Sequence, residues 1–331
     1  LCLLAFWTNK KKLRDFFYGL RLKRSLWLLS GNIIVQGLLF AFSSLILVFI
    51  QFADAFILYP EMVAAGMDAT EAKQWKGIYD RGQPLIQLGT AATISISLTF
   101  VPLIGKYRKM KDSNSVKYYT ELTLRLSLML GLAAAVGLFW IIEPVNVLLF
   151  TDNKGSGALG VLILTIFFSS ILMAGMFILQ TIGRSWVSVL LVVLGILLKI
   201  YLMRILVPSY HLLGAALSTT VSFGVMALLV LHILRTIFKN PILDRRSISI
   251  IAAASLWMSV VLLLDLGLFD FLERYIKQEE RIQAMLEVGI SVVSGAIVYI
   301  WYILKKGLFT QTELTALPLG SKLSKLLPKS R

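Results

Sequence analysis

The chain has too few charged residues, cysteines and histidines for several common classes of protein. Only 15% of its 331 residues are charged, whereas about 25% is typical of a soluble domain. The single cysteine, Cys2, can close no disulfide within the chain, and two histidines are too few for a His/Cys metal site. We therefore expect no disulfide framework, no metal and no cofactor.

Motifs of nucleotide-binding and catalytic proteins are also missing. The chain has no Walker sequence, and Gly155, Gly157 and Gly160 spell G-x-G-x-x-G without a preceding strand. No paired carboxylates and no nucleophile with its base stand out, so we expect that the chain is not an enzyme. Because absence alone decides little, a membrane glycosyltransferase stays open as an alternative.

Long uncharged apolar runs dominate the sequence instead. The 29 residues between Arg24 and Asp54 carry no charge, and similar runs recur along the chain. A helix that crosses a bilayer needs about 20 apolar residues, whereas a soluble helix keeps one face for water. We predict an all-α, polytopic transmembrane helix bundle. Its eight complete spans are expected at about 31 to 53, 83 to 105, 119 to 142, 158 to 182, 186 to 207, 212 to 234, 247 to 269 and 285 to 304.

Basic residues gather in alternate loops between these spans. One side of the membrane receives 23 Lys and Arg against four acids, and the other receives eight against ten. This asymmetry is the positive-inside pattern, and it places the basic loops and the C-terminus in the cytoplasm. The net charge of +15 is thereby explained by topology, so we expect no nucleic-acid partner.

The order of segments is typical of one part of a larger transporter. Residues 1–7 are an apolar stub ahead of a basic segment, the reverse of a signal peptide, and are interpreted as the end of a preceding transmembrane helix. Residues 8–30 are predicted to be a basic amphipathic cytoplasmic linker, with a solvated linker as the alternative. A six-helix lobe at 31–235, two additional transmembrane helices at 236–306 and a basic cytoplasmic tail at 307–331 complete the predicted organisation.

Two spans carry stripes of polar side chains along one helical face. The first stripe consists of Asn32, Gln36, Ser43, Gln51 and Asp54, and the second of Gln83, Gln87, Thr90, Thr93 and Ser97. Polar side chains that face lipid are costly, so each stripe should face a cavity or a neighbouring helix. Stripes on consecutive spans favour a water-filled cavity over interhelical hydrogen bonding alone.

Three ionisable residues sharpen this expectation. Asp54 is placed near the outer end of its span, Arg81 opens the next span, and Lys199 lies well inside the fifth. A cation within the membrane is rare without an anionic partner or substrate. We predict a site or gating role for Lys199, with structural pairing or snorkelling as the alternative, and an interfacial anchor is the alternative for Arg81. The full set of candidate cavity residues is Arg81, Lys199, Asp54, Gln51, Gln87 and Thr90.

Several short motifs resemble a known transporter family. They are Gly77-Ile-Tyr-Asp-Arg-Gly-Gln-Pro-Leu-Ile-Gln-Leu-Gly89, Pro102, Gln180-Thr-Ile-Gly-Arg184, Leu198-Lys-Ile-Tyr-Leu202, Leu206-Val-Pro208 and Gly214-Ala-Ala216. Over residues 31 to 306 the chain resembles the polysaccharide-biosynthesis branch of the MOP flippases, in particular SpoVB/YtgP-like proteins related to the lipid II flippase MurJ. The resemblance implies the second lobe of a MATE/MOP-type two-lobe transporter, in which two six-helix lobes rock around a cationic cavity.

The implied substrate is a lipid-linked oligosaccharide or lipid II, carried across the bacterial cytoplasmic membrane. The implied partners are that substrate, membrane lipids and the missing N-terminal lobe. Arg81 matches a substrate-binding arginine of MurJ-like proteins. In the helix numbering of that family, whose second lobe consists of helices 7 to 12, Asp54 matches an acid at the end of helix 7 and Lys199 matches a lysine frequent in helix 11. The resemblance also places Trp257 and Trp301 near lipid. Two alternatives stay open: a cation-coupled MATE-type multidrug exporter and a non-transporting membrane scaffold.

Overall fold

The computed structural model describes residues 24–239, 242–273, 280–309 and 313, and within this part every regular element is a helix. In the first of these helices, side chains are described only from residue 34 onward. The expected stub at 1–7, most of the linker at 8–30 and nearly all of the tail at 307–331 lie outside the described residues. The helices are α3 (Arg24–Ser44), α4 (Ile46–Ala64), α5 (Ala69–Asp80), α6 (Gly82–Lys109), α7 (Ser113–Trp140), α8 (Ile142–Phe150), α9 (Ser156–Ile163), α10 (Thr165–Thr181), α11 (Ser185–Phe238), α12 (Arg245–Glu273) and α13 (Glu280–Lys305).

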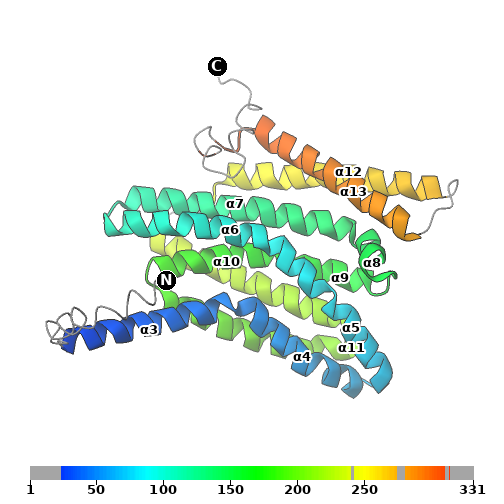
Figure 1. The fold of residues 1–331 in the computed structure, drawn as a ribbon, viewed down its shortest axis with the longest axis horizontal. Coiled ribbons are helices and arrows are strands. Elements are labelled where there is room, and N and C mark those ends of the chain that lie inside the picture. Colours follow the sequence, from blue (N-terminus) through cyan, green and yellow to red (C-terminus); the bar gives the residue numbers. More distant parts are fainter. Residues whose placement is uncertain (1–23, 240–241, 274–279, 310–312, 314–331) are drawn as a thin grey trace, which may run out of the picture.

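The predicted all-helical, polytopic membrane bundle is confirmed. Seven helical stretches in the described part of the chain are long and apolar enough to cross a membrane. In Figure 1 these helices run side by side, with α12 and α13 as a pair beyond α7 and with α3 and α4 on the opposite side of the bundle. Every backbone group at membrane depth can bond within its own helix, which is why helices suit the hydrocarbon core.

The number of spans depends on how the longest helix is counted. The helix α11 has 54 residues, which correspond to about 80 Å of helix, far more than the 30 Å of a hydrocarbon core. It is divided at His211, whose φ of 47° and ψ of −121° are not helical. A Cβ on Gly214 would lie 2.3 Å from the carbonyl oxygen of Leu206, so the chain turns back on itself here. The two arms correspond to the predicted spans at 186 to 207 and 212 to 234.

The helix α10 lies at the centre of the bundle, packed against α6, α7 and α11. Of its membrane-spanning window, together with α9, 78% is buried. Small residues allow this close packing: a Cβ on Gly131 of α7 would lie 2.6 Å from Cβ of Ser170, and one on Gly175 would lie 2.7 Å from Val230. Without a hydrophobic force between helices in lipid, such close backbone approach is a main source of helix association.

The prediction of one span at 31 to 53 is wrong in its boundaries. The helix is interrupted at Leu45, and the second segment, α4, continues to Ala64. Asp54 is therefore not near the outer end of a span but in the middle of α4. Neither glycine nor proline marks this break in the sequence.

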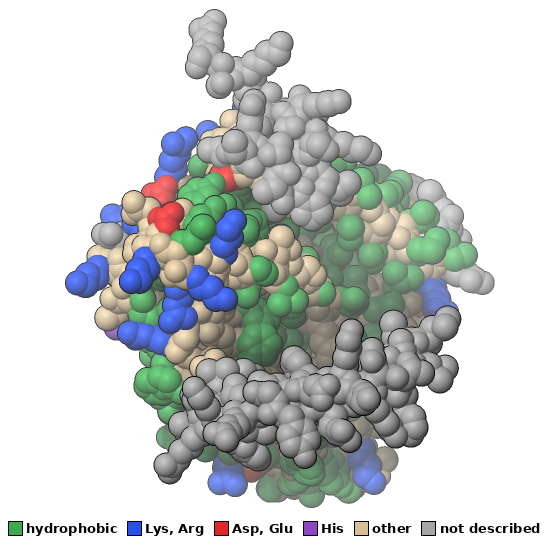
Figure 2. Space-filling view, turned by 60° about the vertical axis from the view of Figure 1, so that its left-hand side comes forward, with side chains coloured by type: hydrophobic (Ala, Val, Ile, Leu, Met, Phe, Trp, Pro, Cys, Tyr) green, Lys and Arg blue, Asp and Glu red, His purple; other side chains and the backbone are tan. Residues whose placement is uncertain are grey.

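Loops that the charge pattern assigns to one side of the membrane lie at one end of the bundle. On the predicted cytoplasmic side, Arg108 of α6 donates to the carbonyl oxygen of Thr181, at 2.8 Å, beside the turn between α10 and α11. Figure 2 looks toward this end, where Lys and Arg side chains gather. At the opposite end Arg81 contacts Asp152, which joins two loops predicted to be external. The contacts thus agree with the parity that the basic residues indicate.

Acidic caps begin two of the helices. The Asp68 carboxylate accepts the backbone N–H of Thr70, and Asp112 accepts the hydroxyl and backbone N–H of Ser115. These hydrogen bonds stabilise the ionised carboxylates, so they lower the pKa of Asp68 and of Asp112 below the usual value for aspartate. The segment at 69–80, expected as part of a loop, is thereby the helix α5, which runs into α6 through Arg81.

Candidate functional site

A buried ion pair joins α4 to the first arm of α11. Nζ of Lys199 lies 2.6 Å from Oδ2 of Asp54, and the two side chains are 0% and 2% exposed. Charged groups at this depth are costly unless they are paired. The predicted position of Lys199 inside its span is confirmed, and its partner is the one acidic residue of α4 at mid-helix.

Further polar groups from other helices surround this pair. Nζ of Lys199 also donates to the carbonyl oxygen of Ile50, at 3.3 Å, and Nε2 of Gln83 on α6 donates to Oδ2 of Asp54, at 3.3 Å. The hydroxyl of Tyr79 on α5, close to Asp54, is 2.8 Å from Oγ1 of Thr219 on the second arm of α11. The buried network therefore connects α4, α5, α6 and both arms of α11, and we call these residues the buried network below.

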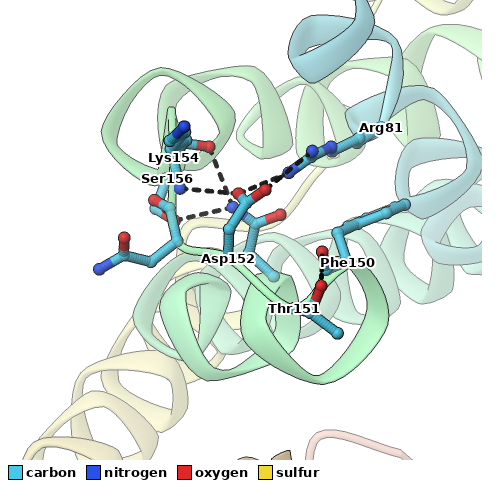
Figure 3. A network of polar contacts seen from close by, with 8 residues as sticks. Arg81, Phe150, Thr151, Asp152, Lys154 and Ser156 are labelled. Carbon is cyan, nitrogen blue, oxygen red and sulfur yellow. Dashed lines mark hydrogen bonds and ion pairs between the residues drawn. The ribbon is translucent and has the colours of Figure 1, made fainter.

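Arg81 lies between α5 and α6 and forms a second ion pair (Figure 3). Its Nη1 is 2.7 Å from Oδ1 of Asp152 and its Nη2 is 3.1 Å from Oδ2, a two-pronged contact. The guanidinium also lies 4.8 Å from the centre of the Phe150 ring. The side chains of Arg81 and Asp152 are 21% and 33% exposed, so this pair, unlike the buried network, can be reached by water.

The loop that carries Asp152 is held by its own hydrogen bonds. Oδ1 of Asp152 accepts the backbone N–H of Lys154 at 3.0 Å, and the Asn146 amide donates to the carbonyl oxygen of Lys154 and to the Ser156 hydroxyl, each at 3.1 Å. Hydrogen bonds from Arg81 and the Lys154 backbone stabilise the ionised carboxylate, so the pKa of Asp152 is lowered. The carboxylate is consequently charged at neutral pH.

The remaining predicted site residues divide between the interior and the surface. Thr90 is fully buried and donates to the carbonyl oxygen of Ile86, at 2.8 Å, so the expectation that it lines a water-filled cavity is wrong. Thr93, one turn further along the same stripe, donates from its hydroxyl to the Ser170 hydroxyl of α10, at 3.2 Å. This part of the stripe serves helix packing. By contrast, Gln87 is exposed and Gln51 is half-buried, so both stay candidates for a polar surface.

An apolar groove lies between α7 and the last two helices. Its volume is about 660 Å³, and its walls are almost entirely apolar. The lining residues are Met129, Leu130, Ala133, Ala134, Gly137, Leu138, Ile141, Met258, Leu262, Ser291, Val292, Gly295, Ala296, Tyr299, Ile300, Ile303, Leu304 and Phe309. At membrane depth a groove of this kind can accept a lipid chain.

Three residues of these sites were not among the predicted ones. Tyr79 lies within the motif Gly77-Ile-Tyr-Asp-Arg81, but an aromatic residue at a helix end gave no sign of a buried partner. Thr219 stands in the run Ser218-Thr-Thr-Val-Ser222, which could have marked a third polar face. Asp152 lies in the predicted loop between the spans at 119 to 142 and 158 to 182, where an acid is usual. No pattern in the sequence indicated its pairing with Arg81.

No protein-family model matches the chain, but one curated relative does. It is the uncharacterized membrane protein YabM of Bacillus subtilis strain 168, 38% identical over 301 residues, which are 90% of this chain and 55% of that protein. The chain thus spans little more than half the length of this relative.

Solved structures with a similar fold are transporters of the MOP superfamily. The lipid II flippase MurJ in its inward closed conformation is 18% identical with a TM-score of 0.51, over 67% of this chain and 46% of MurJ. A MOP-superfamily transporter from Pyrococcus furiosus is 15% identical with a TM-score of 0.50, over 85% and 66% of the two chains. A MATE protein in complex with Br-NRF is 15% identical with a TM-score of 0.51, over 89% of this chain and 72% of that protein. The chain is a multi-pass membrane protein with the fold of MOP-superfamily transporters.

Proposed function

We propose that this chain is part of a flippase that moves a polyprenyl-diphosphate-linked glycan or cell-wall precursor, such as lipid II, across the bacterial cytoplasmic membrane by alternating access. The observation that carries the proposal is the apolar groove of about 660 Å³ between α7, α12 and α13. A transporter of small soluble molecules needs a polar or aromatic pocket, whereas an amphiphilic substrate needs an apolar path beside a polar one.

The two ends of such a substrate have opposite requirements. Its polyprenyl tail stays in hydrocarbon and would lie along the groove, whose lining includes Ala133, Ala134 and Ala296 and so leaves room. Its charged headgroup needs a polar route and fixed cations, which a low-dielectric surrounding strengthens. Arg81 is a partly exposed cation that fits this task, because a guanidinium matches phosphate oxygens with two parallel hydrogen bonds.

The polar route is proposed to lie between this chain and a partner lobe. The exposed face of α6 includes Gln87, Ser95 and Thr99, polar side chains that lipid would not favour. The match covers 46% of MurJ, which fits a chain that is part of a two-lobe transporter, and its assignment as the second lobe with two additional helices rests on the sequence resemblance. The complete cavity would then need the N-terminal lobe. The buried network holds the helices of this lobe together while the two lobes rock as bodies.

A lipid-flipping assay tests the proposal. The full-length protein is reconstituted in proteoliposomes that contain a fluorescent polyprenyl-diphosphate-linked sugar, and membrane-impermeant dithionite reports how much probe reaches the outer leaflet. We expect flipping that Ala296→Phe reduces at least fivefold, because a phenyl ring enters the groove. Ile297→Phe is the matched control, since Ile297 is 62% exposed and does not line the groove. Absence of flipping in vesicles that contain folded protein would refute the proposal.

A cation-coupled exporter is the second candidate, and the position of Asp54 favours it. A buried carboxylate at mid-membrane is the kind of group that such transporters use to bind a proton or Na⁺. Here, however, Lys199 lies 2.6 Å from that carboxylate and neutralises it. Efflux of a small organic cation driven by a Na⁺ or pH gradient, with no lipid flipping, would establish the exporter. If folded protein shows neither lipid flipping nor efflux, the alternative that remains is a non-transporting membrane scaffold.

A further inference from the structure

We propose that Asp152 is an internal counter-anion that occupies the anion-binding face of Arg81 and that a diphosphate headgroup must displace it. The inference rests on the proposed function, because it assigns a control to the cation that is proposed to bind the substrate. It makes the Asp152 loop a determinant of how strongly, and for how long, an anionic headgroup is held.

The geometry of the pair resembles that of a bound oxyanion. Both terminal nitrogens of Arg81 point at the two carboxylate oxygens of Asp152, at 2.7 and 3.1 Å (Figure 3). Phosphate oxygens take the same two hydrogen bonds from a guanidinium. An anion that binds Arg81 by its fork therefore competes with Asp152 for one set of donors, and the two cannot be held at once.

The pair is built so that exchange is possible. Its side chains are 21% and 33% exposed, whereas those of Lys199 and Asp54 are 0% and 2% exposed. A solvent-reachable ion pair contributes only modestly to stability, so a ligand with more negative charge can replace the carboxylate. Lys154 is exposed on the same loop and offers a second cation to an anion that arrives there.

Arg81 and the Asp152 loop are each fixed without the ion pair. A Cβ on Gly82 would lie 2.6 Å from the Leu162 side chain, so the start of α6 packs tightly on α9. The Asn146 amide braces the loop through the carbonyl oxygen of Lys154 and the Ser156 hydroxyl. The main role of the Asp152 charge is thus not to hold the loop in place. An asparagine at this position can still accept the Lys154 backbone N–H.

Asp80 provides a matched control. It is adjacent to Arg81 in the sequence and carries the same charge, but its carboxylate contacts Lys76 at 2.7 Å. Asp80→Asn therefore removes one negative charge from the same end of the bundle and leaves the contact between Arg81 and Asp152. A general electrostatic effect would appear in both variants, whereas displacement of an internal counter-anion would appear in Asp152→Asn alone.

The experiment measures anion affinity of the full-length protein in nanodiscs by calorimetry, with inorganic pyrophosphate in one arm and a polyprenyl diphosphate in the other. For Asp152→Asn we expect the Kd to fall roughly three- to fivefold, the size that follows when an ion pair of this exposure no longer competes. Asp80→Asn should stay within about twofold of the wild type. Adding Arg81→Ala to Asp152→Asn should abolish the gain. If the Kd falls for both probes, the phosphates are the recognised group. If it falls for the polyprenyl diphosphate alone, the diphosphate is recognised only when it is attached to its lipid tail.

An unchanged or higher Kd in folded Asp152→Asn would overturn the proposal. The pair would then be an ion pair that only stabilises the fold. If Asp152→Asn does not fold, Asp152→Ser takes its place, because a hydroxyl can also accept the Lys154 N–H. Failure of the proposed function looks different: pyrophosphate affinity would rise in Asp152→Asn while the wild type flips no lipid. Lipid flipping that depends on Arg81, with no change of Kd in Asp152→Asn, would refute only the counter-anion.

Discussion

Removal of one member of the buried ion pair should cost far more than removal of both. Lys199→Met keeps the length of the side chain but leaves the Asp54 carboxylate with the Gln83 amide, 3.3 Å away, as its donor. Asp54→Asn leaves the Lys199 ammonium with the carbonyl oxygen of Ile50, also at 3.3 Å. Each change strands a charge in a site that is almost completely closed to water, which costs about 3–5 kcal/mol of unfolding free energy.

The double variant should recover most of this loss. With Asp54→Asn and Lys199→Met together, no charge stays at this buried site, and an apolar chain lies where the ammonium stem was. Replacement of a whole buried pair is often close to neutral, so we expect a net cost of about 1 kcal/mol or less and, from the two single costs, a coupling energy of about 5 kcal/mol or more.

Unfolding by SDS in mixed micelles measures these free energies, and Arg204→Met is the control. Arg204 lies on the same arm of α11, contacts Glu61 at 3.6 Å and is 69% exposed. Its removal should cost less than about 1 kcal/mol, as is usual for exposed ion pairs. Single variants that each cost as little as Arg204→Met, or a double variant that costs the sum of the singles, would refute the reasoning.

Three further predictions concern topology, the α11 turn and a helix cap. Cysteine at Asp68 should react with an impermeant maleimide from outside and cysteine at Asn114 should not; equal labelling would contradict the predicted sides. Gly214→Ala should lower the thermal unfolding temperature by several degrees, because its Cβ would meet backbone atoms at 2.3 Å, whereas Gly157→Ala, with nothing within 4 Å, should not. The lowered pKa of Asp112 means that its stabilising contribution is present above the unfolded-state pKa of about 3.9 and is lost as the pH falls through the lower folded value. The difference in unfolding temperature between wild type and Asp112→Ala should therefore shrink between pH 6 and pH 3, and a constant difference would show that the cap is not the cause.

The sequence by itself determined the membrane class, the helical fold and the parity of the loops. Uncharged runs of about 20 residues have one stable form in a bilayer, and basic residues mark the side on which loops stay. It also identified Lys199 as a cation within the membrane, because a charge in an apolar run is visible without any structure. These properties depend on the composition of single segments.

Only the tertiary structure decided which groups meet. Arg81 and its partner Asp152 are 71 residues apart, and Ile50, which accepts from Lys199, is 149 residues from it. Helical periodicity gives the face of a polar side chain but not the helix that this face contacts. For that reason Thr90 was expected at a cavity and lies instead in the packed interior. The packing of α4 against α11 likewise made a buried ion pair of Asp54 and Lys199, two residues that the sequence offered only as separate charges.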